Sequence, residues 1–95
     1  MDYGQYYAEV KRAADLVEAK EYEAALAIFQ QVLDSGISDL DKALMCHNVA
    51  VICDKMGDRD TALAWYDHAI AYETPYMRFT AAEYKAAQLH QYGRT

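Results

Sequence analysis

Apolar residues recur along this chain at intervals of three and four, which is the spacing of an amphipathic α-helix. The clearest case is a pair of runs over residues 44–56 and 61–72, separated by a short polar turn. Gly57 suits the end of the first run, because glycine adopts a left-handed conformation without steric cost. Asp58 or Asp60 can cap the second run. Two amphipathic helices joined this closely are expected to pack as an antiparallel hairpin.

The same pattern predicts three further helices. They are expected over residues 2–19, 22–33 and 76–92, the last ending at Gly93. The apolar stripes expected to face the core are Tyr6, Val10, Ala13 and Val17 in the first helix, and Phe79, Ala82, Ala86 and Leu89 in the fifth. In the loop before the third helix, either Ser38 or Asp39 can act as the cap. Without alternating β-branched strands, the chain is predicted to be all-α.

Small and aromatic residues are spaced alike in the two hairpins. The second hairpin carries them at Cys46, Val49, Ala50, Cys53, Ala62 and Tyr66. In the first hairpin, Ala25 and Phe29 repeat the final pair. This spacing resembles the tetratricopeptide repeat, whose pattern is Trp-x2-Leu-Gly-x2-Tyr followed by Ala-x3-Phe. Cys46, Ala50 and Cys53 stand at its Trp, Gly and Tyr positions.

The resemblance covers essentially the whole chain as two and a half repeats. The first repeat spans about residues 3–34, the second about 40–73, and a half repeat about 76–92. It implies an α-solenoid of five antiparallel helices, in which two helix hairpins are followed by a C-terminal capping helix. In such an array each repeat buries its apolar face by stacking on its neighbours.

In tetratricopeptide proteins, the first helix of each pair lines a concave surface that holds peptides. The resemblance therefore implies a groove, mostly apolar, that binds a partner peptide or helix. Its expected lining residues are Tyr7, Val10, Ala14 and Val17, then Leu44, His47, Asn48, Val51, Asp54 and Lys55, and finally Thr80, Glu83, Tyr84, Ala87 and His90.

Length and charge narrow the classes of function. The chain has 95 residues, which fits a single domain over residues 1–95. Its formal net charge is −6 and its isoelectric point is about 4.8. Without a basic patch, binding to nucleic acid or to an anionic membrane surface is not expected. The acidic start does not resemble a signal peptide and no apolar run reaches bilayer length, so we expect a cytoplasmic protein.

Candidate chemistry is confined to the two cysteines and their neighbours. Cys46 and Cys53 lie roughly 10 Å apart along one predicted helix, which is too far for a disulfide. With His47 and Asp54 they are possible metal ligands. Zinc sites favour closer pairs of thiols, so small buried apolar residues are the favoured interpretation of both cysteines. We expect no enzyme activity, no metal site and no cofactor.

Nine tyrosines are the unusual feature of the composition. Those near the two ends can pack at the rim of the core or form an interface: Tyr3, Tyr6, Tyr7, Tyr76, Tyr84 and Tyr92. The main prediction is a non-catalytic protein-interaction module. Two alternatives stay open, a structural unit that forms a homodimer through its C-terminal helix and a small secretion-type chaperone.

Overall fold

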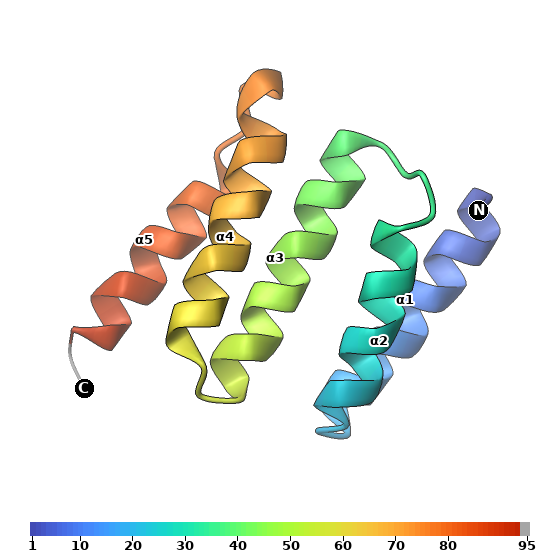
Figure 1. The fold of residues 1–95 in the computed structure, drawn as a ribbon, viewed down its shortest axis with the longest axis horizontal. Coiled ribbons are helices and arrows are strands. Elements are labelled where there is room, and N and C mark those ends of the chain that lie inside the picture. The colour runs from blue at the N-terminus through green and yellow to red at the C-terminus, as the bar shows by residue number, and fades with distance from the viewer. Residues whose placement is uncertain (94–95) are drawn as a thin grey trace.

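The structure, a computed structural model, describes residues 1–93 as a series of helices (Figure 1). The helices are α1 (Tyr3–Glu18), α2 (Tyr22–Leu33), α3 (Asp39–Lys55), α4 (Arg59–Glu73) and α5 (Thr80–Tyr92), with the short 3-10 helix η1 (Thr74–Tyr76) between the last two. No strand occurs among these residues. The predicted all-α class is therefore confirmed.

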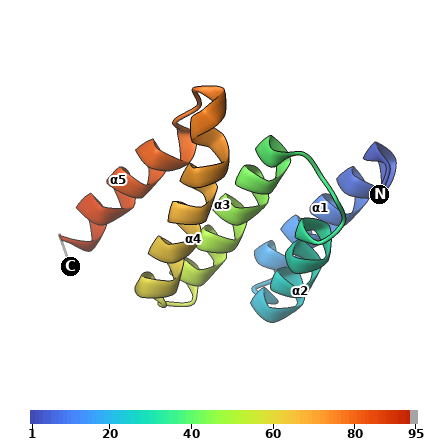
Figure 2. The same ribbon diagram turned by 45° about the horizontal axis from the view of Figure 1, so that its top comes forward.

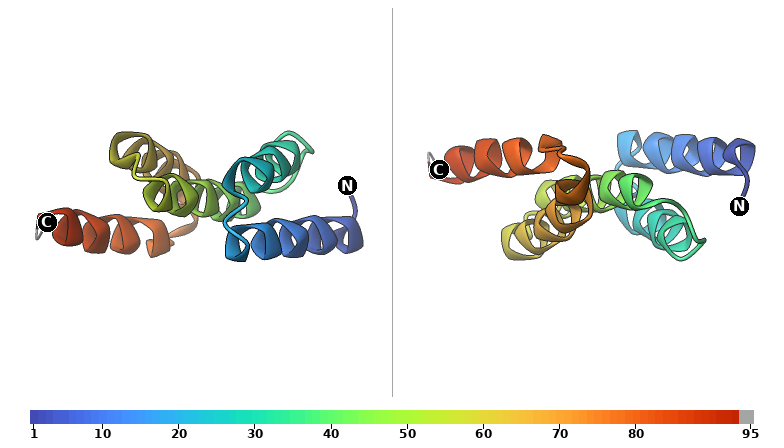
Figure 3. Two further views of the ribbon diagram at one scale, coloured as in Figure 1. Left: turned by 90° about the horizontal axis from the view of Figure 1, so that it is seen from below. Right: turned by 90° about the horizontal axis from the view of Figure 1, so that it is seen from above.

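Each helix packs on the helix that follows it, and the contact between α3 and α4 is the most extensive. Figure 2 shows α1 beside α2 and α3 beside α4, with α5 beyond α4. The result is a flat molecule of 41 × 34 × 15 Å. In Figure 3, α2 and α4 lie in one layer and α1 and α5 in the other, with α3 between the two layers.

Ser38 caps the start of α3 and Asp58 caps the start of α4. Each is the first of the two residues predicted for that position. The Ser38 hydroxyl accepts a hydrogen bond from the backbone N–H of Asp41 at 3.2 Å. The Asp58 carboxylate accepts one from the N–H of Thr61, also at 3.2 Å. Gly57 has a φ of 84°, so the predicted left-handed turn is confirmed.

Alanines lie where the helices approach most closely. Ala25, Ala50 and Ala62 have no exposed surface, and Tyr66 fills the space beside them with none either. They belong to one apolar core that extends from α1 to α4. The alanine positions chosen from the sequence are thus core positions, because small side chains permit close contact between helix backbones.

The fifth helix differs from the prediction in both its start and its rotation. It begins at Thr80 rather than at residue 76, because Met77 adopts a left-handed conformation with a φ of 58°. The residues that face α4 are those at Ala81, Lys85, Gln88 and Tyr92. The predicted stripe is rotated by roughly a third of a turn from this face. Consequently Phe79 and Leu89 are about half exposed, at 49% and 46%.

Glu73 explains the observed rotation. Its side chain is 4% exposed and accepts hydrogen bonds from the backbone N–H groups of Ala81 and Ala82. The carboxylate therefore caps α5 from the end of α4. Phe79, the residue at the N-cap position of α5, cannot do so, because its side chain has no hydrogen-bond acceptor. Since Glu73 is itself on α4, this contact turns Ala81 toward α4.

Candidate functional site: the α1–α3 groove

An open apolar groove with a volume of about 190 Å³ lies between α1 and α3. Its lining residues, which define what we call the α1–α3 groove, are Val10, Ala14, Val17, Phe29, Asn48, Val51 and Ile52. Apart from the Asn48 amide, these side chains are apolar. In Figure 3, α3 lies between α1 and α5 and is set back from both.

The groove follows from the order in which the helices pack. α1 packs on α2 and α2 packs on α3, whereas α1 and α3 approach each other less closely. On α1, Tyr6 and Ala13 are buried, while Val10 and Val17 at the edge of the same face are half-buried. Val51 on α3 is also half-buried. The apolar side chains that face one another across this gap are therefore accessible to a ligand.

A second hollow, more polar, lies between α3 and the start of α5 and has a volume of about 240 Å³. Its lining residues include Leu44 and His47 of α3 and Thr80 of α5. Glu73 and Arg78 bring charged groups to it. The carboxylate of Glu73 already holds the N-terminus of α5, so this hollow is in part a structural joint.

Three aromatic rings, one each from α3, α4 and α5, lie close together beside this hollow. The ring of His47 lies 4.6 Å from that of Tyr84 and 5.7 Å from that of Tyr66, measured between centroids. Burial lowers the pKa of His47, and nearby Glu73 acts in the opposite direction. Burial also raises the pKa of Tyr66, whose hydroxyl has no hydrogen-bond partner among the described residues. Tyr84 of α5 thus lies against the rings of His47 on α3 and Tyr66 on α4, and all three rings are tilted or edge-on to one another.

The far end of α5 is tied to α3 by a tyrosine. The Tyr92 hydroxyl donates to the Asp54 carboxylate at 2.5 Å. Burial, together with this bond, raises the pKa of Tyr92 to about 12. The guanidinium of Arg59 lies over the same ring, 4.5 Å from its centroid. Tyr92, one of the tyrosines considered for the rim of the core or for an interface, is half-buried and packs on α3 and α4.

The structure brings together two separate groups of the predicted lining residues. One group forms the α1–α3 groove: Val10, Ala14, Val17, Asn48 and Val51. The other lies where α3 meets α5: Leu44, His47, Thr80 and Tyr84. Asp54 contacts Tyr92 instead. The remaining five residues are exposed and line neither hollow: Tyr7, Lys55, Glu83, Ala87 and His90.

Sequence reasoning missed several residues of these sites. Phe29 and Ile52 form part of the groove lining, but apolar character alone does not distinguish a residue of the groove from one of the core. Glu73 gives no local signal, because its bonds to residues 81 and 82 depend on how the intervening turn folds. Asp41 is recognisable as an acid in the first turn of a helix, but its position beside Tyr6 is a tertiary feature.

Few side chains in the described part of the chain are candidates for catalysis or metal binding. Cys46 and Cys53 are unpaired and buried, and burial raises the pKa of both thiols. Within residues 1–93, no three histidine, cysteine or acidic side chains are grouped as metal ligands. None of the described helices combines the length and apolar character needed to cross a membrane. A functional account therefore has to start from the α1–α3 groove, the second hollow and the three aromatic rings beside that hollow.

Comparison with known proteins places the chain in a family. A family model described as a domain of unknown function, DUF6340, matches residues 11–93. No curated protein and no solved structure matches the chain. The resemblance to tetratricopeptide repeats is corrected by this match, since no model of that family was found. Small residues at close contacts arise in many helix hairpins, so the spacing was not specific. Because the match covers most of the chain, the protein belongs to the DUF6340 family.

Proposed function

We propose that this protein is a non-catalytic interaction module that binds a helix or extended segment of a partner protein in the α1–α3 groove. One observation carries the proposal. Half-buried valines from α1 and α3 converge on an apolar hollow that the described residues leave open. Accessible apolar surface of this kind, arranged as a groove, is typical of sites that receive the apolar face of a helix.

The arrangement of the helices supports the same proposal. We infer that the two hairpins and α5 act as an open, solenoid-like array, and the packing of each helix on the next supports this. An array of this kind presents one extended face to a partner. A small secretion-type chaperone is a narrower form of the proposal, in which the partner is an exported protein.

The experiment replaces two groove valines with glutamine. Val10→Gln and Val51→Gln add a polar amide to the lining but no charge, so any loss of binding reports on apolar contact. Each change is expected to weaken capture of a partner roughly tenfold, the effect of losing about 1.4 kcal/mol of contact. Ile70→Gln is the matched control, because Ile70 is also half-buried but lies on α4.

Partners are to be captured from a cell extract with the wild-type protein and identified by mass spectrometry. The affinity of each is then measured with the purified variants, after circular dichroism has established that they remain folded. Loss of binding in the groove variants, with binding retained by Ile70→Gln, supports the proposal. Unchanged affinity in Val10→Gln and Val51→Gln would show that the groove is not the site.

A second candidate function is self-association through α5. The apolar stripe that includes Phe79 and Leu89 does not face α4 and is about half exposed. A second copy that packed along this stripe would bury it. Light scattering over a range of concentrations tests the idea with Phe79→Glu and Leu89→Glu. A wild-type protein that stays monomeric at high micromolar concentration would dismiss it.

A further inference from the structure

A further hollow, which we call the α2–α4 hollow, lies between the end of α2, the first half of α3 and α4, and has a volume of about 410 Å³. The rings of Trp65, His68 and Tyr72 line it from α4, and Leu33 and Cys46 add apolar surface. It shares no lining residue with the α1–α3 groove. In Figure 3, α2 and α4 form a layer separate from α1. Hollows of about 300–1,000 Å³ with mainly apolar linings and a few polar groups are typical of small-molecule sites.

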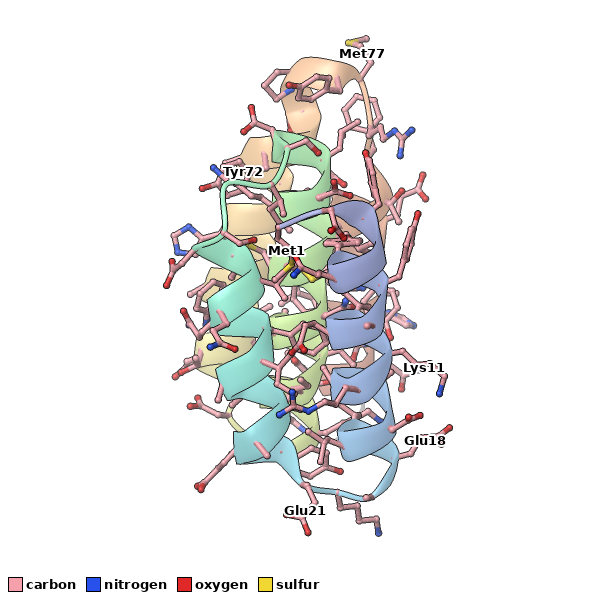
Figure 4. The ribbon with its side chains drawn as sticks, turned by 90° about the vertical axis from the view of Figure 1, so that its right-hand side faces the viewer. Met1, Lys11, Glu18, Glu21, Tyr72 and Met77 are labelled. Carbon is pink, nitrogen blue, oxygen red and sulfur yellow. The ribbon has the colours of Figure 1, made fainter. Side chains whose placement is uncertain are left out.

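The aromatic rings of this hollow have accessible surface. Trp65 and Tyr72 are half-buried, and His68 is exposed. The rings of Trp65 and His68 lie 5.4 Å apart between centroids and are inclined at 60°, so they do not cover each other face to face. Figure 4 shows Tyr72 on the side of the molecule where the loop after α2 runs. A planar apolar group in the hollow can therefore pack against these rings.

Lys42 brings a positive charge to the hollow that no acid of the described chain pairs with. Its side chain is half-buried, and its ammonium lies 5.7 Å from the centroid of the Tyr72 ring. Acidic residues outnumber basic ones by 15 to 9, yet the ion pairs within residues 1–93 all involve other cations. A ligand carboxylate placed beside Lys42 would therefore gain a charge-assisted hydrogen bond.

Asp34 gives the same hollow a negative charge. It is exposed at the end of α2 and forms no ion pair within the described residues. Lys42 and Asp34 thus line one hollow without pairing with each other. A phosphate with two negative charges would be repelled by Asp34, whereas a zwitterion presents one charge of each sign. Gln30, at the same rim, adds an amide that can donate or accept a hydrogen bond.

From these groups we propose that the α2–α4 hollow binds an aromatic α-amino acid. The ring of the ligand packs against Trp65 and Tyr72. Its carboxylate pairs with Lys42, and its ammonium pairs with Asp34. An aliphatic amino acid lacks the flat ring, and an aromatic acid or amine lacks one of the two charges. This site is independent of the proposed function, because it uses none of the residues that line the α1–α3 groove.

L-Phenylalanine is the probe, and three analogues each lack one of its features. L-Cyclohexylalanine lacks the aromatic ring, 3-phenylpropionate lacks the ammonium and 2-phenylethylamine lacks the carboxylate. Trp65 is the only tryptophan of the chain, so its fluorescence reports on binding at the hollow itself, and calorimetry gives an independent dissociation constant. We expect phenylalanine to bind in about the millimolar range or more tightly. It should bind about tenfold more tightly than 2-phenylethylamine and about threefold more tightly than the other two analogues.

Lys42→Met removes the charge of Lys42 but keeps an apolar side chain against Tyr72. It should weaken phenylalanine binding about tenfold and abolish the preference for phenylalanine over 2-phenylethylamine, which a purely structural role would leave intact. Asp34→Asn should abolish the preference over 3-phenylpropionate in the same way. The matched control is Lys55→Met, at the other end of α3 and outside the hollow, which should change affinity less than about twofold.

Four outcomes would overturn the inference. The first is the absence of binding, by fluorescence and by calorimetry, up to roughly 10 mM phenylalanine. The second is equal affinity for phenylalanine and 2-phenylethylamine, and the third is equal weakening by Lys42→Met and Lys55→Met. The fourth is loss of phenylalanine binding in Val10→Gln, which would place the ligand in the α1–α3 groove. The proposed function is judged separately, by the capture of a protein partner.

Discussion

Replacing Glu73 with alanine is expected to detach the start of α5 from α4. The carboxylate of Glu73 is 4% exposed, and its oxygens lie 2.9 and 3.2 Å from the backbone nitrogen of Ala81. The nitrogen of Ala82 lies 3.2 Å from the nearer oxygen. These N–H groups belong to the first turn of α5, where no intrahelical acceptor is available. Glu73→Ala leaves both donors without this acceptor.

The expected loss can be worked from these contacts. A hydrogen bond to a charged group contributes about 1.5–3 kcal/mol, and two donors are involved. The favourable interaction with the helix dipole adds about 0.5 kcal/mol, whereas burial of the carboxylate offsets part of the total. We therefore expect Glu73→Ala to lower the free energy of unfolding by about 3 kcal/mol. Glu73→Gln keeps one acceptor oxygen without the charge, so its loss should be about 1.5 kcal/mol.

The matched control is Glu83→Ala. Glu83 also lies in the first turn of α5, but it is exposed and its charge interacts chiefly with the helix dipole. Its removal should cost about 0.5 kcal/mol or less. Urea denaturation followed by circular dichroism measures all three variants. Hydrogen exchange should be measured separately for the amides of α4 and α5, because α5 can unfold locally while the other helices stay folded.

The pattern of amide hydrogen exchange shows whether Glu73 stabilises α5 alone, as a helix cap, or the whole protein. If Glu73 caps α5, Glu73→Ala should lose protection throughout α5, while the amides of α1 and α2 change much less. A loss no greater than that of Glu83→Ala, with α5 still protected, would refute the role assigned to the carboxylate. An equal loss of protection in every helix would instead mean that Glu73 supports the whole core.

Three further predictions address single groups. Tyr66→Phe should raise the free energy of unfolding by about 1 kcal/mol in urea denaturation, because it removes a buried hydroxyl that has no partner in the described chain; a decrease would show that the hydroxyl is hydrogen-bonded. Because burial lowers the pKa of His47 below its ordinary 6.5, the unfolded chain binds the proton more tightly, so this contribution to stability is present above pH 6.5 and lost as the pH falls below it. His47→Phe should reduce the slope of stability against pH in that range, and an unchanged slope would contradict this. Lys20→Gly should stabilise the protein by about 1 kcal/mol in thermal denaturation, because Lys20 has a φ of 62°, and a lower melting temperature would contradict the assigned strain.

The two hairpins could be predicted from the sequence because their signals are local. Gly57 and Asp58 mark a turn within a few residues, and intervals of three and four place Ala50 and Ala62 on facing sides of the helices. These features depend on steric rules that operate over one or two helical turns. The α1 and α3 walls of the groove follow from the same periodicity, since Val10 and Val51 lie at the edges of buried stripes.

The fifth helix could not be predicted in the same way, because a contact between helices determines its start and rotation. Its apolar residues suggested that Phe79 and Leu89 face inward. Instead, Glu73 holds the N–H groups of Ala81 and Ala82, and Lys85 pairs with Asp67 of α4 at 2.6 Å. Polar contacts thus override the apolar stripe. In Figure 4, Met77 stands at the top of the turn before α5.

Binding and stability are hard to separate on α3, and this should guide the choice of variants. Its buried residues face α2 and α4 on several sides: Ala43, Met45, Cys46, Val49, Ala50, Ile52 and Cys53. A change at Val51 therefore lies next to buried Ala50 and Ile52, and it can lower affinity by shifting the core. On α1, by contrast, only Tyr6 and Ala13 are buried. Val10→Gln is consequently the cleaner test, and its effect on partner affinity should carry more weight than that of Val51→Gln.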